Sequence, residues 1–307
     1  MLTPPFRLYD RVFNRFVTRD VYFFILMVYD EVEEYSLKII FKPPAKGFII
    51  MTDLKTIMAC ENNLICHCAS LVKTSFAHLF YSDTNKNSHD CNHAVISDFT
   101  DPESSLEMIE AFYYSKAVTP RIFYGGFKNE REVLTPVLKK RGWTIETADR
   151  KLMFWGGGEL EEYTSPTLQI IHKERFDDEI YNVFYAHDGG EWCALATRDC
   201  MNYGSIDVFV GREKSIAGEM SAASVSIEHD KITGLALVQD VFTLPQFRGK
   251  GYARTMMSAA MRWQLGHYES KDIYLWVENP IAMRVYEDVG FIYSDETPDV
   301  WFAYKRP

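Results

Sequence analysis

Apolar runs separated by short polar turns predict a β-sheet in the second half of the chain. The runs cover residues 205–210, 216–227 and 232–243, and the polar turns GREKS and EHDK separate them. Short polar turns between such runs are typical of antiparallel strands that follow one another in a meander. A shorter run at residues 168–172 predicts an earlier strand, and residues 177–187 have the apolar spacing of a helix.

The pattern changes to a helical period after the meander. Between residues 252 and 265, apolar residues recur every three or four positions, which is the spacing of an amphipathic helix. Residues 273–277 then predict a buried strand, residues 281–289 a helix and residues 300–304 a closing strand. A strand, a helix and a second strand predict a parallel pair with a right-handed crossover. The second half is therefore predicted to be a mixed β-sheet flanked by helices, an α/β (α+β) fold.

A weaker copy of this ending occurs in the first half. It predicts, in order, a strand at 94–99, a helix at 104–115, a strand at 121–124, a helix at 130–140 and a strand at 151–155. The segment VLKKRGW resembles RVYEDVGF of the second half, and KLMFW resembles VWFAY. Such self-similarity indicates an internal repeat.

A glycine-rich linker separates the two halves. Gly156, Gly157 and Gly158 are followed by acidic residues at 159–162 and by Pro166, a composition that favours an exposed connection. A chain of 307 residues is also about twice the usual domain length. We therefore expect two lobes, residues 1–158 and residues 159–307.

Composition excludes several classes of function. The net charge of −10, with scattered lysines and arginines, argues against nucleic-acid binding. The most apolar run, residues 21–28, is far shorter than the roughly 20 residues that span a bilayer, and it predicts a buried strand or helix. Since no secretory leader precedes it, we expect a cytoplasmic protein without a membrane partner.

Six cysteines in a chain of this length indicate free thiols in a reducing compartment. One group of residues is a candidate zinc site: Cys60, the triplet Cys66-His67-Cys68, and Cys91 with His93. Their spacings are not the usual ones of zinc fingers, and cysteines and histidines in an apolar, aromatic-rich half of a chain are often simply packed. We therefore expect no metal.

The candidate chemistry begins at residues 244–257 (LPQFRGKGYARTMM), where a strand ends in a glycine-rich turn that opens into a helix. Such a turn directs backbone N–H groups toward one point beside the positive end of the helix dipole, which suits phosphate or pyrophosphate. Gly249 and Gly251 are predicted to adopt positive φ. The cations Arg248, Lys250 and Arg254 surround the turn.

Three alternatives compete at this turn. In a P-loop, Lys250 would be followed by serine or threonine, but Gly251 follows it. A dinucleotide fingerprint starting at Gly249 would place a glycine where Arg254 stands, after a strand of a βαβ unit and not of a meander. The third alternative is a tight strand-to-helix connection without a ligand.

Two motifs in sequence order resemble those of the GNAT superfamily of N-acyltransferases. The first, [Q/R]-x-x-G-x-[G/A], is matched by residues 248–253 (RGKGYA). The second, N-x-x-A-x-x-x-Y followed by Gly-Phe, is matched by Asn279, Ala282, Tyr286 and residues 290–291. The resemblance covers about residues 168–307. It implies a GNAT-like central mixed β-sheet flanked by helices and, together with the repeat, two tandem GNAT-like lobes.

The resemblance also implies acetyl-CoA, or a related acyl-CoA, as co-substrate. Its pyrophosphate would bind at Arg248, Gly249, Lys250, Gly251, Tyr252, Ala253 and Arg254. Its pantetheine arm would lie between the strand that ends at Thr243 and the strand at 273–277, pairing with the backbone of Val241, Phe242 and Thr243. Asn279 would bond the same arm, although an asparagine before a proline is also a usual helix N-cap.

The resemblance implies Tyr286 as the acid that protonates the departing thiolate, with a packed core aromatic as the alternative. The base that deprotonates the amine is expected to be Asp240 if strand alternation directs it to the acceptor face. Glu219 and Glu228 are weaker candidates, and water alone is a further alternative. The acceptor is expected to be a primary amine of a small molecule or peptide, in a pocket shaped by residues 187–203.

The first half lacks these signatures. After Phe99 the chain reads TDPESSLEM without a glycine, Arg131 stands where Asn279 would align, and Leu138 stands where Tyr286 would align. We therefore expect residues 1–158 to be a degenerate lobe without a cofactor loop and residues 159–307 to be the catalytic domain. An N-acetyltransferase is the leading hypothesis; the alternatives are a non-catalytic acyl-CoA-binding sensor or interaction module, and a phosphate-binding nucleotide enzyme.

Overall fold

The computed structural model describes residues 25–28, 36–39, 52–188, 190–216, 218–269, 272–296 and 298–306. The chain divides into two units, Met1–Phe48 and Ile49–Pro307. In the first unit, β1 (Ile25–Val28) pairs antiparallel with β2 (Ser36–Ile39). The apolar run at residues 21–28 therefore contributes strand β1, and its residues 21–24 lie outside the described residues.

A seven-stranded mixed sheet forms the centre of the second half of the chain, in the order β14-β8-β13-β12-β11-β10-β9. The strands are β8 (Lys151–Trp155), β9 (Leu168–Lys173), β10 (Ile206–Ser215), β11 (Gly218–His229), β12 (Ala236–Thr243), β13 (Ile273–Val277) and β14 (Phe291–Tyr293). Strands β10, β11 and β12 form the predicted antiparallel meander, and β9 extends it by pairing antiparallel with β10. The parallel pair of this sheet is β12 with β13, and not the predicted pair of residues 273–277 with residues 300–304.

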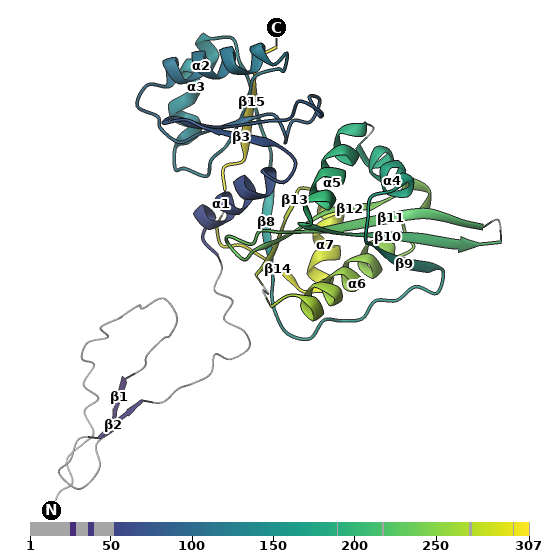
Figure 1. The fold of residues 1–307 in the computed structure, drawn as a ribbon. Coiled ribbons are helices and arrows are strands. Elements are labelled where there is room, and N and C mark those ends of the chain that lie inside the picture. The colour runs from purple at the N-terminus through teal and green to yellow at the C-terminus, as the bar shows by residue number, and fades with distance from the viewer. Residues whose placement is uncertain are drawn as a thin grey trace, which may run out of the picture. The chain divides into compact units, whose positions relative to one another are not determined.

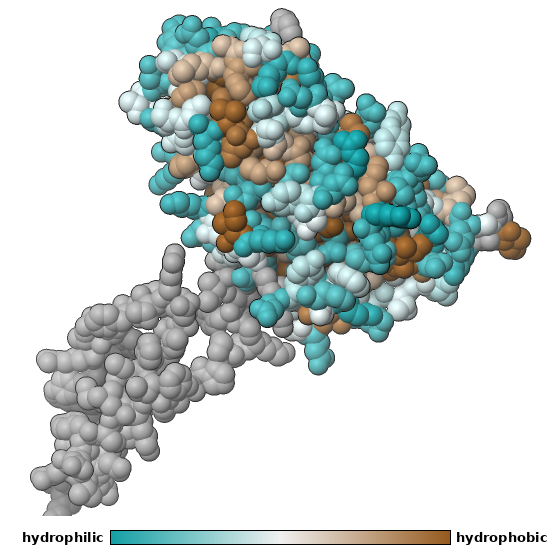
Figure 2. Space-filling view, viewed as in Figure 1, coloured by the Kyte–Doolittle hydropathy of each residue, from teal (hydrophilic) through white to brown (hydrophobic). Residues whose placement is uncertain are grey.

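One predicted turn of the meander is wrong. The segment GREKS continues strand β10, and the reversal occurs after Ser215. The β10–β11 hairpin extends past the end of β12, whose pairing with β11 stops at Thr243. On this part of β10, the side chains of Arg212 and Glu213 are partly exposed and form ion pairs. Figure 2 shows an apolar tip at the end of this hairpin, where Ile216 and Met220 are exposed.

Helices cover both faces of the seven-stranded sheet (Figure 1). On one face lie α6 (Tyr252–His267) and α7 (Pro280–Val289); on the other lie α4 (Asp178–Asp188), α5 (Glu191–Tyr203) and α1 (Leu54–Ile65). The strands alternate accordingly: Ile273 and Leu275 pack in the α6–α7 core, whereas Tyr274 between them packs against α1. We call the face with α1, α4 and α5 the upper face.

A six-stranded sheet forms the centre of the first half, in the order β3-β4-β5-β6-β15-β7. Its strands are β3 (Ser70–Lys73), β4 (Ala77–Tyr81), β5 (Ala94–Ile96), β6 (Arg121–Phe123), β7 (Thr144–Thr147) and β15 (Trp301–Tyr304). Helices α2 (Pro102–Ser115) and α3 (Glu130–Lys140) pack on it around Leu106, Leu134 and Leu138. The mixed α/β architecture with two helix-flanked sheets is as predicted.

The two sheets exchange a strand. Strand β8, from the first half, lies between β13 and β14, and strand β15, from the end of the chain, lies between β6 and β7. The expectation that residues 300–304 close the second sheet is therefore wrong. Both strands are short, apolar and aromatic, so either one can occupy this position in either sheet. A boundary near residue 158 stays a prediction, and each sheet contains one strand from across it.

Helix α1 also joins the first half to the second sheet. Ile57, Cys60 and Leu64 on its buried face pack against Phe154 and Tyr274 of that sheet. Asp53 caps the helix, because its carboxylate accepts a hydrogen bond of 2.7 Å from the backbone N–H of Thr56. Residues 1–90 contain no motif, yet part of them covers the upper face of the second sheet.

The exchange makes a testable prediction about stability. Trp301, 1% exposed, packs in the core of the six-stranded sheet, and Met153, fully buried, packs in the core of the seven-stranded sheet. We expect Trp301→Ala to cost about 3–5 kcal/mol and Met153→Ala about 2–5 kcal/mol. Amide hydrogen exchange should accelerate first in β6 and β7 for Trp301→Ala and first in β13 and β14 for Met153→Ala. Faster hydrogen exchange first in β13 and β14 for Trp301→Ala, or first in β6 and β7 for Met153→Ala, would contradict the exchange of strands between the two sheets.

Candidate active site

The glycine turn lies between the 3₁₀ turn at Pro245–Phe247 and helix α6. Gly249 has φ +79° and Gly251 has φ +78°, so both predicted positive φ angles are confirmed. A Cβ added to either glycine would meet no heavy atom within 4 Å, which leaves the backbone open to an approaching group. Gly251 is the N-cap of α6 and supplies no side chain to the first-turn N–H groups of the helix.

The three cations of the turn are held at its rim. Lys250 pairs with Glu213 at 2.8 Å, and Arg254 pairs with Asp288. Arg248 donates through Nε to the carbonyl of Thr243 at 3.1 Å. Since the side chains of Lys250 and Arg254 remain 44% and 43% exposed, they can turn toward an anion at the turn.

Tyr252 contributes to the site in a different way from its neighbours. Its side chain is 2% exposed, and its hydroxyl forms hydrogen bonds of 2.8 Å with both Glu213 and Thr167. The ring therefore fixes the start of α6 against β9 and β10. Only its backbone N–H is left for a ligand at the turn.

Strands β12 and β13 part after two paired residues. The parallel pairing is Ala236↔Ile273 and Leu237↔Tyr274, and no further pair follows, although β12 continues to Thr243. On its other side, β12 stays paired with β11 as far as Thr243. The backbone groups of Val241, Phe242 and Thr243 that face β13 therefore have no partner in a described strand, as an added extended chain requires.

A bulge interrupts β12 at the same place. The register with β11 shifts between Ser224 and Ser226, and Asp240 has φ +54°, which is rare for a residue other than glycine. The Asp240 carboxylate accepts a hydrogen bond of 2.5 Å from the Ser226 hydroxyl and lies 3.8 Å from the Cys193 sulfur of α5. Asp240 therefore lies on the upper face, opposite α6 and α7.

Tyr286 lies in helix α7, on the face of the sheet opposite the upper face. Its side chain is 7% exposed and packs in the α6–α7 core near Phe291. Its hydroxyl forms no hydrogen bond with another described residue, and burial raises the pKa of Tyr286 to about 12. The phenol is therefore protonated at neutral pH, with its proton still available.

Asn279 is the N-cap of α7. Its Oδ1 accepts a hydrogen bond of 2.8 Å from the backbone N–H of Ile281, and Pro280 occupies the first helical position. The capping role predicted from the sequence is confirmed. Because the residue is exposed, its amide nitrogen is also accessible, and the proposed bond to pantetheine stays a prediction.

The two weaker base candidates have different surroundings. Glu228 is 4% exposed and fully engaged, because it binds His67 at 2.8 Å, Gln239 at 3.0 Å and Ser205 at 3.3 Å. Glu219 is far more open, at 45% side-chain exposure. Neither contacts the bulge at Asp240 in the part of the chain that the structure describes.

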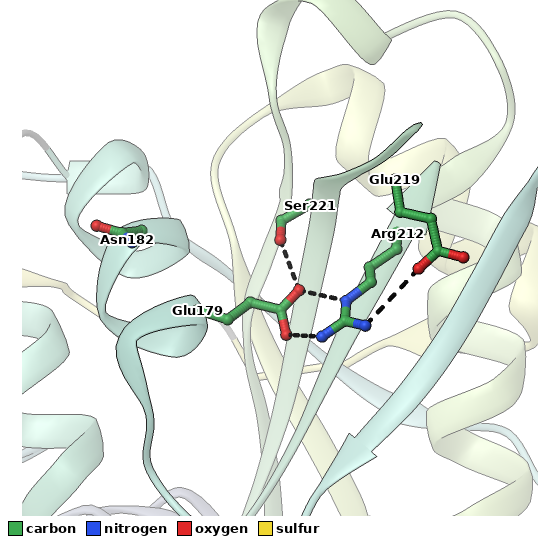
Figure 3. Close-up of a pocket in the computed structure, with 5 residues that line it drawn as sticks. All are labelled: Glu179, Asn182, Arg212, Glu219 and Ser221. Atoms are coloured by element: carbon green, nitrogen blue, oxygen red, sulfur yellow. Dashed lines mark hydrogen bonds and ion pairs between the residues drawn. The ribbon is translucent and has the colours of Figure 1, made fainter. Parts of the chain in front are cut away.

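Glu219 lines a polar pocket of about 420 Å³ on the upper face (Figure 3). The pocket is lined by Glu179, Asn182, Arg212, Glu219 and Ser221. Glu179 of α4 and Arg212 of β10 point toward each other and form a bidentate pair of 2.5 and 2.6 Å, and Ser221 adds a third bond of 2.7 Å to Glu179. Arg212 thereby ties α4 to the hairpin.

The segment expected to shape the acceptor pocket, residues 187–203, meets both β12 and the first half of the chain. The His187 ring stacks on Phe242 with ring centroids 4.3 Å apart. The carbonyl of Trp192 accepts a hydrogen bond of 2.8 Å from Asn85, and Tyr203 stacks on His67 at 4.4 Å. Residues of the first half therefore reach the upper face beside α5.

One further residue on this face is not among those expected from the sequence. Glu61 of α1 accepts, through Oε1, hydrogen bonds of 2.8 Å from the Tyr274 hydroxyl and from the Trp276 indole. A carboxylate on an amphipathic helix ordinarily indicates a solvated position. The one available signal is its spacing from Ile57 and Leu64, four residues before it and three after it, which places it beside the apolar stripe.

The cysteines are free thiols, as expected. Cys68 and Cys91 lie with their sulfurs 3.4 Å apart, and Cys60 bonds the Tyr274 hydroxyl. Among the described residues, no group of three or more histidines, cysteines or carboxylates is arranged to hold a metal ion. In the same part of the chain, no helix combines the length and apolarity needed to cross a membrane.

The site fits an acyl-CoA by three observations. Two glycines with positive φ leave the backbone open at the N-terminus of α6, β12 leaves its edge unpaired where β13 departs, and a protonated phenol lies on the neighbouring helix. These features suit a pyrophosphate, an extended amide chain and a departing thiolate, respectively.

Residues 204–293 match the family model described as an acetyltransferase (GNAT) domain. The chain therefore contains a GNAT acetyltransferase domain in the half that carries the glycine turn, and the family expected from the two motifs is confirmed.

Two curated relatives are amine acetyltransferases. The chain is 33% identical over 91 residues to the aminoglycoside N(6')-acetyltransferase type 1 of Salmonella typhimurium, a match that covers 27% of this chain and 60% of the relative. It is 32% identical over 68 residues to the spermidine N(1)-acetyltransferase of Vibrio cholerae, covering 22% of this chain and 39% of the relative. The chain thus spans less than two thirds of the length of either relative.

Solved structures extend the likeness to both lobes. A GCN5-related N-acetyltransferase from Kribbella flavida superposes with a TM-score of 0.58 and 16% identity, over 84% of this chain and 96% of that one. A tandem GNAT protein from the clavulanic acid biosynthesis pathway has a TM-score of 0.50 and 10% identity, over 78% and 84% of the two chains. At these identities the comparison shows the fold alone, and it confirms two tandem GNAT-like lobes.

The Glu179–Arg212 pair predicts a loss of stability in acid. Hydrogen bonding from Arg212 is the largest cause that lowers the pKa of Glu179, from 4.5 to about 2. Because this folded-state pKa is depressed, the stabilisation is complete above pH 4.5 and is lost as the pH falls toward 2. We expect Arg212→Met to lower the free energy of unfolding at pH 7 by about 1–3 kcal/mol and by much less at pH 3, measured by urea denaturation.

The exposed pair Lys140–Glu103 provides the control. Its side chains are 68% and 50% exposed, so Lys140→Met should change the free energy of unfolding by at most about 0.5 kcal/mol at either pH. Equal effects of the two substitutions would contradict the role given to Arg212.

Proposed function

We propose that the chain is an acetyl-CoA-dependent N-acetyltransferase that acetylates a primary amine of a small molecule. The observation that carries the proposal is the parting of β12 and β13 directly before the glycine turn, with Tyr286 on the helix that follows β13. The activities for which the two relatives are named, acetylation of aminoglycosides and of spermidine, support an amine acceptor. The net charge of −10 favours the encounter with a cationic amine.

The binding roles follow from the geometry. The backbone of residues 249–254 would hold the pyrophosphate, aided by Arg248, Lys250 and Arg254. The free edge of Val241, Phe242 and Thr243 would pair with the amides of the pantetheine arm, and the exposed amide of Asn279 would bond the same arm. Bound acetyl-CoA supplies an activated acyl carbon on a good leaving group.

The two proton transfers would then occur on opposite faces of the sheet, one at Asp240 and the other at Tyr286. Asp240 on the upper face removes one proton from the acceptor ammonium, and the resulting amine attacks the thioester carbonyl carbon. As the new C–N bond forms and the C–S bond breaks, Tyr286 donates its proton to the departing sulfur. The amine nitrogen loses its second proton, which restores the phenol, so the net products are the amide, free CoA and one proton.

The first lobe would take no part in this chemistry. Between β5 and α2 the chain reads SDFTD, without a glycine, and Leu138, which aligns with Tyr286, is fully buried in the core. We propose that this lobe is a degenerate copy whose role is to cover the upper face. The proposal also places the protein in the cytoplasm, where acetyl-CoA and reduced thiols coexist.

Tyr286 and Gly251 provide the first test of the activity. With acetyl-CoA and a panel of amines, the protein should release free CoA, which a thiol reagent detects. Tyr286→Phe should lower kcat about 10²-fold without unfolding the protein, because it removes the proton donor and keeps the ring. Gly251→Asp, which adds strain and a negative charge at the turn, should abolish binding of acetyl-CoA in calorimetry.

Full turnover by Gly251→Asp would contradict the pyrophosphate site. Thermal stabilisation by acetyl-CoA without CoA release from any amine would instead identify a non-catalytic acyl-CoA-binding module. Stabilisation by ATP or NAD alone would identify a nucleotide enzyme.

Asp240 provides the second test. Asp240→Asn keeps the size of the side chain and an oxygen that accepts from Ser226, but it removes the base. We expect kcat to fall about 10²-fold with little change in the KM for acetyl-CoA. An unchanged kcat, with kcat still rising with pH as in the wild type, would show that water alone removes the proton.

A further inference from the structure

Helix α1 lies across the upper face of the seven-stranded sheet, from beside the edge strand β14 as far as β11. Its first residue, Leu54, bonds Glu296 next to β14, and just past its last turn His67 bonds Glu228 of β11. Glu61, at its middle, therefore lies over β13 and β12. It belongs to the first half of the chain, outside the acetyltransferase domain at residues 204–293.

The two donors to Glu61 place it at the opening between β12 and β13. Tyr274 is the last residue of β13 that pairs with β12, and Trp276 lies two residues further, where the strands have parted. Both side chains are on the upper face, since Ile273 and Leu275 point to the opposite core. The carboxylate therefore marks the start of the opening, on the same face as Asp240.

No lysine, arginine or histidine among the described residues forms an ion pair with the Glu61 carboxylate. Arg150, whose charge acts on this carboxylate, is itself paired with Glu278 at 2.6 Å. Both hydrogen-bond donors to Glu61, Tyr274 and Trp276, are neutral and share Oε1. Burial is the largest cause that raises the pKa of Glu61, and the nearby Glu228 raises it further. Glu228 has the His67 imidazole as its ion-pair partner, whereas the hydrogen-bond donors to Glu61 are neutral. An incoming cation would relieve the cost of this buried charge.

Aromatic rings border the same place. The ring of Tyr124, from the first lobe, meets the Trp276 ring edge to face at a centroid distance of 6.3 Å. Aromatic rings beside a carboxylate suit an alkyl ammonium, which needs a negative group for its charge and ring surface for its methylenes.

On the basis of the acetyl transfer proposed above, we propose that Glu61 binds a second cationic group of the acceptor, so that the enzyme selects small aliphatic diamines or polyamines. One amino group loses its proton to Asp240 and is acetylated. The other stays an ammonium ion paired with Glu61. The first half of the chain thereby supplies a specificity-determining residue to a site whose chemistry belongs to the second half.

A matched pair of amines tests this role. We expect kcat/KM for 1,4-diaminobutane to exceed that for n-butylamine at least about tenfold, one ion pair being worth roughly 1.4 kcal/mol. In Glu61→Gln the ratio should fall to near one, through a higher KM for the diamine with kcat retained. The glutamine oxygen still accepts from Tyr274 and Trp276, so the melting temperature should be close to that of the wild type. Glu61→Asp, which keeps the charge, should restore part of the ratio.

Glu162→Gln is the control for charge. It removes the same charge from an exposed residue that pairs with Arg262 of α6, on the opposite face of the sheet, and it should leave the ratio unchanged. Direct calorimetric binding of 1,4-diaminobutane provides a readout independent of turnover and should weaken about tenfold in Glu61→Gln.

The outcomes separate this inference from the proposed function. Acetylation of both amines with equal kcat/KM by the wild-type protein would overturn the role of Glu61 and leave the N-acetyltransferase intact. A loss in Glu61→Gln that is equal for both amines would show a structural role only. Binding of the diamine without CoA release would support the cation site and contradict catalysis.

Discussion

The early parting of β12 and β13 is the constraint on which the rest of the site depends. Two parallel strands normally stay paired along their common length, because each lost ladder bond leaves a donor and an acceptor unsatisfied. Here pairing stops after Leu237, while β11 holds the far edge of β12 as far as Thr243. The bulge at Asp240 re-aims the strand without detaching it from β11. The free edge is thus held in place at the residues that precede the glycine turn.

The exchange of β8 and β15 stabilises this opening from the other side. Strand β13 has lost β12 as a partner over its second half, yet it pairs along its length with β8 through Val277↔Lys151. Because β8 belongs to the first half and β15 to the end of the chain, neither lobe can complete its sheet alone. The first lobe therefore supports the site mechanically even though its own turn has no glycine.

The sequence predicted the local features of the site well and its long-range features poorly. The φ angles of Gly249 and Gly251 and the cap at Asn279 follow from residue type and nearest neighbours, which is information that a short segment contains. The exchange of strands does not, because KLMFW and the final WFAY satisfy the same pattern and the pattern does not specify which sheet receives them. Glu61 was missed for a related reason. Its significance comes from Tyr274 and Trp276, more than two hundred residues away, and not from its own helix.

The positions of the ionisable groups fit a transfer that needs opposite conditions on its two sides. In the proposed transfer, Tyr286 must keep its proton until charge develops on sulfur, and burial in the apolar α6–α7 core disfavours the phenolate. The proposed base must instead remain ionised, and the Asp240 carboxylate accepts a hydrogen bond from the Ser226 hydroxyl on the upper face. A single layer of strands separates the two environments. The parting of β12 and β13 is the place where a thioester could face both, so in the proposed mechanism the break in the ladder that exposes the strand edge also lies between the proposed acid and the proposed base.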